Sequence, residues 1–540
     1  MIDRINTKFQ IPQKAEQNNK NTTFKGAGTA VLTGLRGLNN SPAIGACAVD
    51  LCSMVIPRTA IEFKNRGPQA GIEAAFREGA SCFIHACVGL IGLGAATLIS
   101  GKFNQQYGVK AQNIFANGDT INNLSNIWKT SEGQRQFFDG FLQNIKGLNG
   151  TEWRSVSPSA RDDIVNGLVS LADKTEQMAK ASGKNKLTLA KEVKDLKTVV
   201  LSKVTKDTGA QASFKLNAGA KEVSASLGEL VDNAVVLSNS FKDKTKEKLP
   251  EFIKTLKSNK VASTLLGMGI CAILCMSVQP LNRYLTKKRT GQDGFVGVDN
   301  KEGDKSKGFK TAKTIAGVGF PLFAMKTIGK PSDLLANIQF NSKVPTINQF
   351  KFLYGLTIGS RFLSSRDSNE LREGIIKDTL GFTNWLILGG MVSKLTARAL
   401  GGKELINNPV AQDGAKKGIK YGLKWLTKAS VKSFDEVLLP NAKEITKNGK
   451  MLKFSELFRK ADSATKSKVL KIAGSQIAGY LYSGLVLGVG IAKLNIFITK
   501  QVQARKKASM NMNKQVNPKY DINYLSKMQC ELSSVFKDFN

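Results

Sequence analysis

The stretch VASTLLGMGICAILCMSVQPLNRYLTKK, residues 261–288, decides the fold of this 540-residue chain. Its first 21 residues are predominantly apolar, which is enough for an α-helix to cross a hydrocarbon core of about 30 Å. A basic border follows directly, formed by Arg283, Lys287 and Lys288. The segment therefore has the composition of a membrane-spanning helix with flanking charges.

The same pattern occurs again near the end of the chain. Ile472–Ala492 is a second run of 21 predominantly apolar residues with a basic border behind it. The two borders agree at fixed positions, and two more pairs of short motifs occur in the same order in both halves. The four matches are Leu281-Asn282 with Leu494-Asn495, Thr286-Lys287 with Thr499-Lys500, Pro42-Ala43-Ile44 with Pro345-Thr346-Ile347, and Arg77-Glu78-Gly79 with Arg372-Glu373-Gly374. This repetition predicts an internal duplication.

Composition favours helices throughout. The chain has 13 prolines, which interrupt helices, and 50 glycines, which allow membrane helices to pack closely. We therefore predict an all-α, multi-pass membrane protein built from an internal duplication, with soluble helical inserts. The predicted segments are a disordered polar leader (1–40), a first membrane hairpin unit (41–101), a soluble helical insert (102–260), a closing transmembrane helix (261–288), a linker (289–330), a second membrane unit (331–394), a basic helical insert (395–471), a second closing transmembrane helix (472–500) and a basic polar tail (501–540).

The number of membrane spans follows from the apolar runs. Ser41–Pro57 is a poor candidate because Asp50 at its centre costs about 2.5–3.5 kcal/mol for insertion, so a half-buried or re-entrant helix is expected there. The remaining four runs predict a parallel repeat with N- and C-termini in the cytoplasm. Six spans, which add 41–57 and 345–361, would instead make the halves inverted repeats. The four predicted spans are Ala80–Ser100, Val261–Leu281, Ile375–Ser393 and Ile472–Ala492.

The net charge of +37 predicts an anionic partner, either anionic lipid or nucleic acid. Five lysines recur every four residues and would lie along one face of a helix beside Trp425, which is typical of a helix on an anionic lipid surface. A solvated face on a soluble helix explains the same pattern equally well. The basic stretches lack interleaved aromatic residues, which makes nucleic acid an unlikely ligand. The predicted lipid-facing lysines are Lys416, Lys420, Lys424, Lys428 and Lys432.

Ionisable residues near membrane depth are the candidate functional groups, because they are expensive to bury in lipid. Asp50 and His85 lie within or beside apolar runs, and His85 is the only histidine. The pairs Arg77/Glu78 and Arg372/Glu373 are further candidates, although both also fit the start of an interfacial helix.

Catalytic and cofactor motifs are missing from the sequence. There is no Walker motif, G-x-S-x-G, H-E-x-x-H, EF-hand or dinucleotide fingerprint, so we predict no enzyme activity, no metal and no cofactor. Six of the seven cysteines lie in apolar runs, which argues against a disulfide framework. Gly484 and Gly488 form a GxxxG motif that suggests pairing of membrane helices, including a homo-oligomer.

Three functions remain after these exclusions. The first is a non-enzymatic scaffold or envelope component that binds lipids and partner proteins. The second is a small transporter or channel of two repeated halves, with Asp50 and His85 lining its path. The third is a soluble, basic nucleic-acid-binding helical protein. We favour the scaffold, because Asp50 and His85 have no polar counterparts in the second half: the repeat aligns them with Leu353 and about Leu380.

Overall fold

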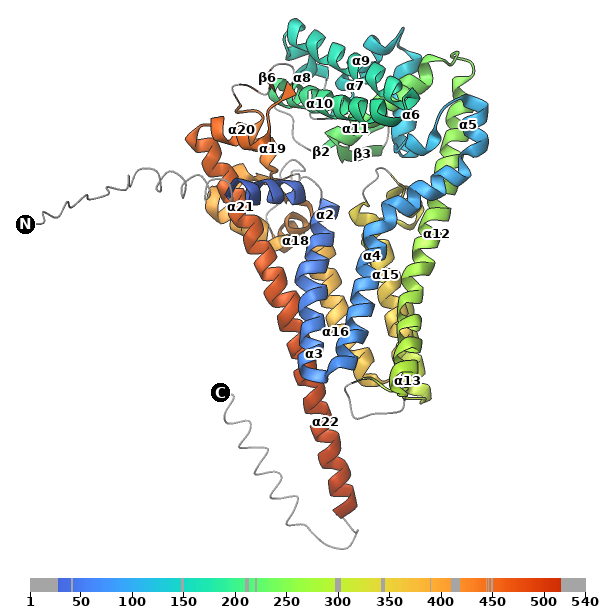
Figure 1. Cartoon of the computed structure of the whole chain (residues 1–540), viewed down its shortest axis with the longest axis vertical. Helices are drawn as coiled ribbons and strands as arrows, with labels where there is room; N and C mark the ends of the chain where they lie inside the picture. Colours follow the sequence, from blue (N-terminus) through green and yellow to red (C-terminus); the bar gives the residue numbers. More distant parts are fainter. Residues whose placement is uncertain are drawn as a thin grey trace, which may run out of the picture.

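The structure, a computed structural model, is a tall bundle of helices with two folded units at one end (Figure 1). It is all-α apart from short strands. We call the end that carries these units the insert end. The opposite end, called the basic end, carries Arg283, Lys287, Lys288, Lys307 and Lys500. The structure describes residues 28–515 except 40–41, 147–149, 209–212, 219–220, 297–302, 341–344, 389, 409–417, 443, 445 and 448–449.

Within the described residues, four helices are long and apolar enough to cross a membrane: Ile44–Arg66, Pro68–Ile99, Leu249–Thr290 and Ser463–Lys506. The last two contain the predicted spans 261–281 and 472–492, and Pro68–Ile99 contains the predicted span 80–100 except Ser100. The first, however, is the segment that the sequence argument excluded because of Asp50.

The first half of the bundle passes down, up and down again between the two ends (Figure 1). Residues 58–78 form the turn region of a long helical hairpin. Pro57 does not end the first helix, because it lies in the first turn of a helix that follows a π-helical segment. Gly67, with φ +90°, and Pro68 make the turn. These elements are α2 (Pro42–Ala48), η1 (Val49–Val55), α3 (Ile56–Arg66), α4 (Pro68–Ile99) and α12 (Leu249–Thr290).

The second half follows the same course with more breaks. The predicted span 375–393 is not one helix, because it changes to a π-helix after Phe382 and is interrupted at Gly390, with φ +60°. The predicted linker 289–330 contains a 20-residue helix that packs against α15. The elements are α13 (Lys307–Lys326), η3 (Pro331–Asp333), α14 (Leu334–Asn337), α15 (Ile347–Leu363), α16 (Ser368–Phe382), η4 (Thr383–Ile387), α17 (Met391–Gly401), α21 (Ser463–Tyr482), η7 (Ser483–Gly490) and α22 (Ile491–Gln515).

Helices α4 and α12 cross at two glycines. A Cβ on Gly92 would lie 2.3 Å from the ring of Phe340, and one on Gly267 would lie 2.8 Å from the same ring. Phe340 thus fills the crossing, and its carbonyl accepts a hydrogen bond from the buried Lys260 ammonium at 3.3 Å. Lys260 also donates to the Ile114 carbonyl, which ties the bundle to the first insert.

The first insert folds around its own apolar core, which includes the fully buried Phe137, Phe138, Phe141 and Trp153. Ile164 is also buried in this core. The elements are α5 (Gly101–Tyr107), η2 (Ala111–Asn113), α6 (Gly118–Lys129), α7 (Gln134–Gln143), β1 (Ile145–Lys146), α8 (Gly150–Ser155), α9 (Pro158–Lys180), α10 (Gly183–Thr208), β2 (Ser213–Ala218), β3 (Lys221–Ser226) and α11 (Leu227–Lys242); β1, β2 and β3 form an antiparallel sheet in that order.

The second insert has a smaller core around Phe434 and Phe454. Residues 28–39, predicted to belong to a disordered leader, form a helix whose Leu32 packs into this core and whose Arg36 pairs with Asp435 at 2.7 Å. The elements are η5 (Gly402–Leu405), β4 (Ile406–Asn407), α18 (Ile419–Lys428), β5 (Ser430–Val431), α19 (Phe434–Leu438), β6 (Thr446–Lys447), β7 (Lys450–Met451) and α20 (Phe454–Lys460); β4 pairs with β5 and β6 with β7.

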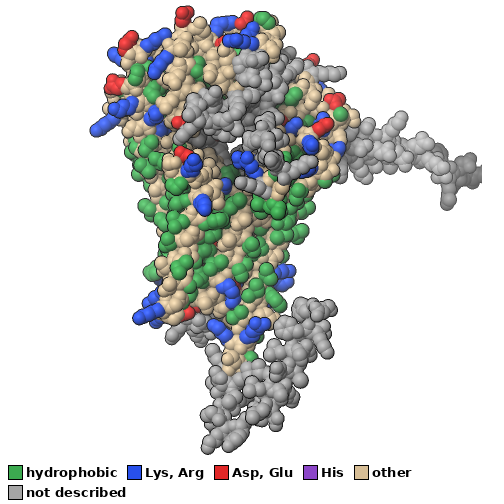
Figure 2. All heavy atoms as spheres, turned by 180° about the vertical axis from the view of Figure 1, so that it is seen from behind, with side chains coloured by type: hydrophobic (Ala, Val, Ile, Leu, Met, Phe, Trp, Pro, Cys, Tyr) green, Lys and Arg blue, Asp and Glu red, His purple; other side chains and the backbone are tan. Residues whose placement is uncertain are grey.

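An apolar surface covers the bundle between its two ends (Figure 2). The exposed side chains include Phe83 and Leu90 on α4, Ile273 on α12, Ile315 on α13 and Leu485 on η7. A water-soluble bundle would carry polar side chains at most of these positions.

Candidate functional site

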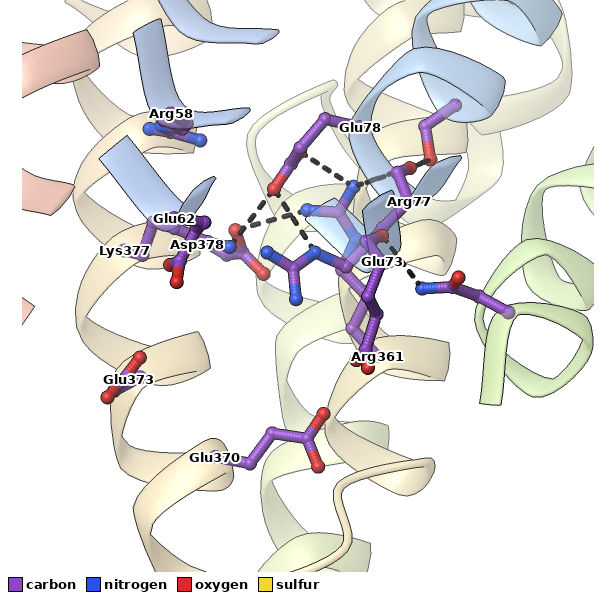
Figure 3. A network of polar contacts seen from close by, with 12 residues as sticks. Arg58, Glu62, Glu73, Arg77, Glu78, Arg361, Glu370, Glu373, Lys377 and Asp378 are labelled. Carbon is purple, nitrogen blue, oxygen red and sulfur yellow. Dashed lines mark hydrogen bonds and ion pairs between the residues drawn. The ribbon is translucent and has the colours of Figure 1, made fainter. Parts of the chain in front are cut away.

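A cluster of charged side chains lies inside the bundle, toward its basic end (Figure 3). The residues come from α3, α4, the C-terminal end of α15, the α15–α16 connection and α16. We call the cluster the ion-pair network. Its members are Glu62, Arg66, Glu73, Arg77, Glu78, Arg361, Arg366, Glu370, Glu373, Lys377 and Asp378.

Two ion pairs are exchanged between the halves of the chain. Arg366 of the second half forms two hydrogen bonds with Glu73 of the first, at 2.5 and 3.2 Å. Arg66 of the first half forms the matching pair with Glu373 of the second, with one bond at 3.0 Å. Phe295 lies between the two arginines, with its ring centre 4.9 Å from the Arg66 guanidinium and 5.6 Å from that of Arg366. Each half therefore supplies the counter-charge for the other.

Two asparagine side chains form hydrogen bonds with the backbone carbonyls of Glu73 and Glu373. Asn282 Nδ2 donates to the Glu73 carbonyl at 3.1 Å, and Asn495 Nδ2 donates to the Glu373 carbonyl at 3.1 Å. Both asparagines are buried, and they are the residues that the repeated border motif aligned. The structural role of that motif is to fix the start of α4 and of α16 against the long closing helices.

Arg361 joins the centre of the network. Its guanidinium donates to Glu78 at 3.0 Å and to Asp378 at 3.2 Å. Glu78 also accepts from Lys377 at 3.0 Å and from Arg77 at 3.3 Å (Figure 3). The eleven members comprise six acids and five bases, and each of them forms an ion pair with at least one other, which offsets the cost of burying the charges.

A small cavity of about 30 Å³ lies within the network. Arg361 Nε and Gln279 Oε1 belong to its lining residues, and both atoms are buried without a hydrogen-bond partner. This volume is close to the share of one water molecule in the liquid. The cavity can hold water that bridges the two atoms, and it is too small for an organic substrate.

Asp50 and His85 meet at Tyr354, closer to the insert end. The Tyr354 hydroxyl donates to the Asp50 carboxylate, and the ring of His85 stacks on that of Tyr354 with centroids 4.1 Å apart. His85 Nε2 lies 3.7 Å from Cys275 Sγ, and its Nδ1 is buried without a partner. Asp50 is 4% exposed and His85 1%. Among the described residues, no cationic side chain forms an ion pair with Asp50.

Three π-helical segments surround this second polar site. η1 carries Asp50, η4 carries Trp385, which packs edge-on against Tyr354, and η7 packs against η1. The Leu487 carbonyl of η7 accepts two hydrogen bonds from Arg58, at 3.3 and 3.2 Å. A π-helical turn shifts the backbone hydrogen bonds by one residue, and such turns occur often at functional sites.

The sequence identified only part of these sites. Asp50, His85, Arg77, Glu78 and Glu373 do lie in them. Arg372 lies beside the network, where its guanidinium donates to Thr499 Oγ1 at 2.8 Å. The sequence argument missed several members, although Glu73-x₃-Arg77-Glu78 recurs 300 residues later as Glu373-x₃-Lys377-Asp378 and could have revealed them. The missed residues are Glu62, Arg66, Glu73, Arg361, Arg366, Glu370, Lys377, Asp378, Tyr354 and Phe295.

The predicted basic helix is shorter than its lysine pattern. α18 ends at Lys428, and Lys432 lies beyond it, where its backbone N–H donates to the Leu405 carbonyl at 2.9 Å. Lys416 falls outside the described residues. Trp425 is buried in the core of the second insert, whereas Ile419 and Leu423 are exposed. The continuous five-lysine face is therefore wrong, although an amphipathic helix is present.

The GxxxG motif is used within the chain. A Cβ on Gly488 would lie 2.1 Å from the Ser53 carbonyl oxygen of η1, whereas one on Gly484 would meet no atom within 4 Å. The two glycines therefore do not share a free face for a second copy of the chain.

Within the described ranges, no group of three or more His, Cys, Asp or Glu side chains is arranged to hold a metal ion. Comparisons with protein-family models, curated protein sequences and solved structures found no match to this chain.

Proposed function

We propose that this protein is a multi-pass membrane scaffold that displays two helical domains on one face of a membrane. The observation that carries the proposal is the inverted distribution of polarity across the bundle. Asn282 is buried beside the ion-pair network, whereas Tyr284 on the same helix is 63% exposed. Asn495 is buried in the same way, and Phe497 beside it is 59% exposed. Charges inside and apolar groups outside are the arrangement expected of a bundle whose solvent is lipid.

The positions of the inserts and charges support one orientation. Both inserts lie at the insert end, and the short connections near Gly67, Thr290 and Arg366 lie at the basic end (Figure 1). Lysines and arginines in short connections favour the cytoplasmic side. We therefore place the basic end in the cytoplasm and the inserts outside. Residues 28 and 515 lie at opposite ends, so this orientation puts residue 515 in the cytoplasm and residue 28 outside, whereas the sequence favoured two cytoplasmic termini.

We further propose that the two halves are parallel repeats. Each half descends, ascends, carries an insert at the insert end and descends again, and α13 returns the chain between them. The exchanged pairs Arg66–Glu373 and Arg366–Glu73, together with Asn282 and Asn495, support this symmetry. These contacts align Glu73 with Glu373, an offset of 300 residues between the halves. The Arg-Glu-Gly triplets, which align Arg77 with Arg372, gave an offset of 295 residues.

Extraction and labelling test the membrane proposal. The full-length protein should stay in the pellet after alkaline carbonate extraction. In a cysteine-free background, Asp162→Cys on the first insert should react with a membrane-impermeant maleimide added to intact cells. Lys288→Cys at the basic end should react only after permeabilisation, because the bundle places the two positions on opposite sides. Release by carbonate contradicts the membrane proposal, and labelling of both positions from one side contradicts the arrangement.

Proton conduction is the second candidate function, because Asp50, Tyr354 and His85 form a buried polar group at membrane depth. His85, however, stacks on Tyr354, and its Nδ1 has no hydrogen-bond partner among the described residues, so the three side chains do not form a continuous hydrogen-bonded relay, which favours the scaffold. We expect proteoliposomes to lose an imposed pH gradient at the same rate with the native protein and with Asp50→Asn. Gradient loss that the native protein accelerates at least tenfold over Asp50→Asn would favour conduction instead.

A further inference from the structure

A groove on the outer surface of the bundle lies at the basic end, between the N-terminal parts of α13 and α16. Its volume is about 420 Å³. The groove combines polar groups near the end of the bundle with an apolar wall farther along. The lining residues are Asp304, Ser306, Gly308, Phe309, Ala312, Ser368, Leu371, Arg372, Ile375 and Ile376.

Arg372 brings an uncompensated positive charge to this groove. One guanidinium nitrogen donates to Thr499 Oγ1, and Nε is buried without a hydrogen-bond partner. The neighbouring carboxylate, Glu373, already pairs with Arg66. No carboxylate of the described chain lies within ion-pair distance of Arg372.

Other positive groups surround the same place. Lys313 lies over the ring of Phe309 at 5.5 Å, and the exposed Lys307 and Lys310 form no ion pair with a described residue. The one carboxylate in the lining, Asp304, accepts a hydrogen bond from the Ser306 backbone N–H at 2.9 Å. The balance of charge at the groove therefore favours an anion.

Both helix N-termini at the groove are capped by side chains of this chain. The Ser306 hydroxyl accepts a hydrogen bond from the Phe309 backbone N–H at 3.2 Å, and the Asp367 carboxylate accepts from the backbone N–H groups of Asn369 and Glu370 at 2.9 Å. A phosphate in the groove would therefore contact the Arg372 and lysine side chains.

The apolar wall of the groove continues into the lipid-facing surface. Phe309 and Ala312 lead along α13 to Ile315, which is 68% exposed, and to Val318. A water-soluble phosphate would gain nothing from this wall, whereas an acyl chain would bury apolar surface along it.

We propose that this groove binds one anionic phospholipid, with the phosphate beside Arg372 and the surrounding lysines, and an acyl chain along Ala312 and Ile315. This site is separate from α18, where the lysine pattern had suggested lipid contact. It rests on the proposal that the bundle spans a membrane. The positive charge and the apolar wall both contribute to the choice of ligand. One substitution can remove the charge and another can block the groove, so the two contributions can be tested separately.

Native mass spectrometry of the detergent-solubilised full-length protein can measure this binding with phosphatidylglycerol as the probe. We expect phosphatidylglycerol to bind more tightly than phosphatidylcholine. Arg372→Gln should weaken the binding of phosphatidylglycerol at least roughly fivefold, since one basic residue near a membrane surface contributes about that factor. Ala312→Trp should also weaken it, because the indole would fill the groove without changing its charge.

Arg505→Gln is the matched control, because Arg505 is exposed at the same end but does not line the groove. This variant should bind phosphatidylglycerol as the native protein does. Native-like affinity in both Arg372→Gln and Ala312→Trp would overturn the site, as would full competition by inorganic phosphate alone. Carbonate extraction of the same variants separates the two proposals: lost lipid selectivity in a protein that stays in the membrane pellet contradicts only the groove.

Discussion

Replacing Arg366 by glutamine is expected to lower the free energy of unfolding by about 3–5 kcal/mol, the usual effect of removing one partner from a buried ion pair. Arg366 neutralises both Glu73 and Glu370, and its side chain is only 2% exposed. Glutamine would leave two carboxylates in the bundle without their main counter-charge. Reversible unfolding in mixed detergent micelles would measure the loss.

Two further variants make this prediction specific. Arg135→Gln removes an arginine whose partner, Asp162, is largely exposed, so it should change stability by less than about 1 kcal/mol. Arg366→Lys keeps the charge but loses the two-point geometry, and it should fall between the native protein and Arg366→Gln. Equal stability of Arg366→Gln and Arg135→Gln would contradict the structural importance of the exchanged pairs.

Replacing Gly488 by leucine is expected to destabilise the bundle by about 3 kcal/mol, at the upper end of the usual effect of overpacking. Even a Cβ at this position would overlap the Ser53 carbonyl oxygen, and backbone atoms cannot rotate away as a side chain can. η1 and η7 would have to separate, and the hydrogen bonds from Arg58 to Leu487 would be strained. The loss should appear as a lower midpoint in the same unfolding measurement.

Gly484→Leu is the natural control, because it belongs to the same GxxxG motif and faces open space. Leucine is a better helix former than glycine by up to about 1 kcal/mol, so this variant should be neutral or slightly more stable. A shift in oligomeric state with Gly484→Leu, but not with Gly488→Leu, would instead indicate that the motif joins two copies of the chain.

The sequence predicted the all-helical class because proline scarcity and long apolar runs are local properties. It excluded the segment around Asp50, which the structure includes among its candidate spans, because the cost of a buried acid was assessed on an isolated helix. In the structure Tyr354, which is 304 residues away, donates a hydrogen bond to that carboxylate. A local pattern cannot reveal a partner so distant in the chain.

The same reason explains the missed half of the ion-pair network. Arg366 and Glu73 look like ordinary polar residues at helix ends, and only the packing of α4 against the α15–α16 turn makes them partners. The predicted span 375–393 failed for a different reason. Lys377 and Asp378 belong to the ion-pair network, and the helix changes to a π-helix after Phe382 and is interrupted at Gly390, which adopts a left-handed conformation. The repeated border was visible in the sequence because Asn282 and Asn495 make the same hydrogen bond, each to the backbone carbonyl of a glutamate, and therefore recur as the same residue type.

The exchanged ion pairs also constrain how the chain can be made. Glu73 and Arg366 are 293 residues apart. At the usual ribosomal speed of about 5–20 residues per second, roughly 15 to 60 s separate the synthesis of the glutamate from that of its arginine. In the proposed membrane arrangement, the first hairpin would stand during that interval with the Glu73 carboxylate unneutralised. The nascent protein must therefore keep Glu73 protonated, keep it near water, or hold it against an insertion factor until the second half arrives.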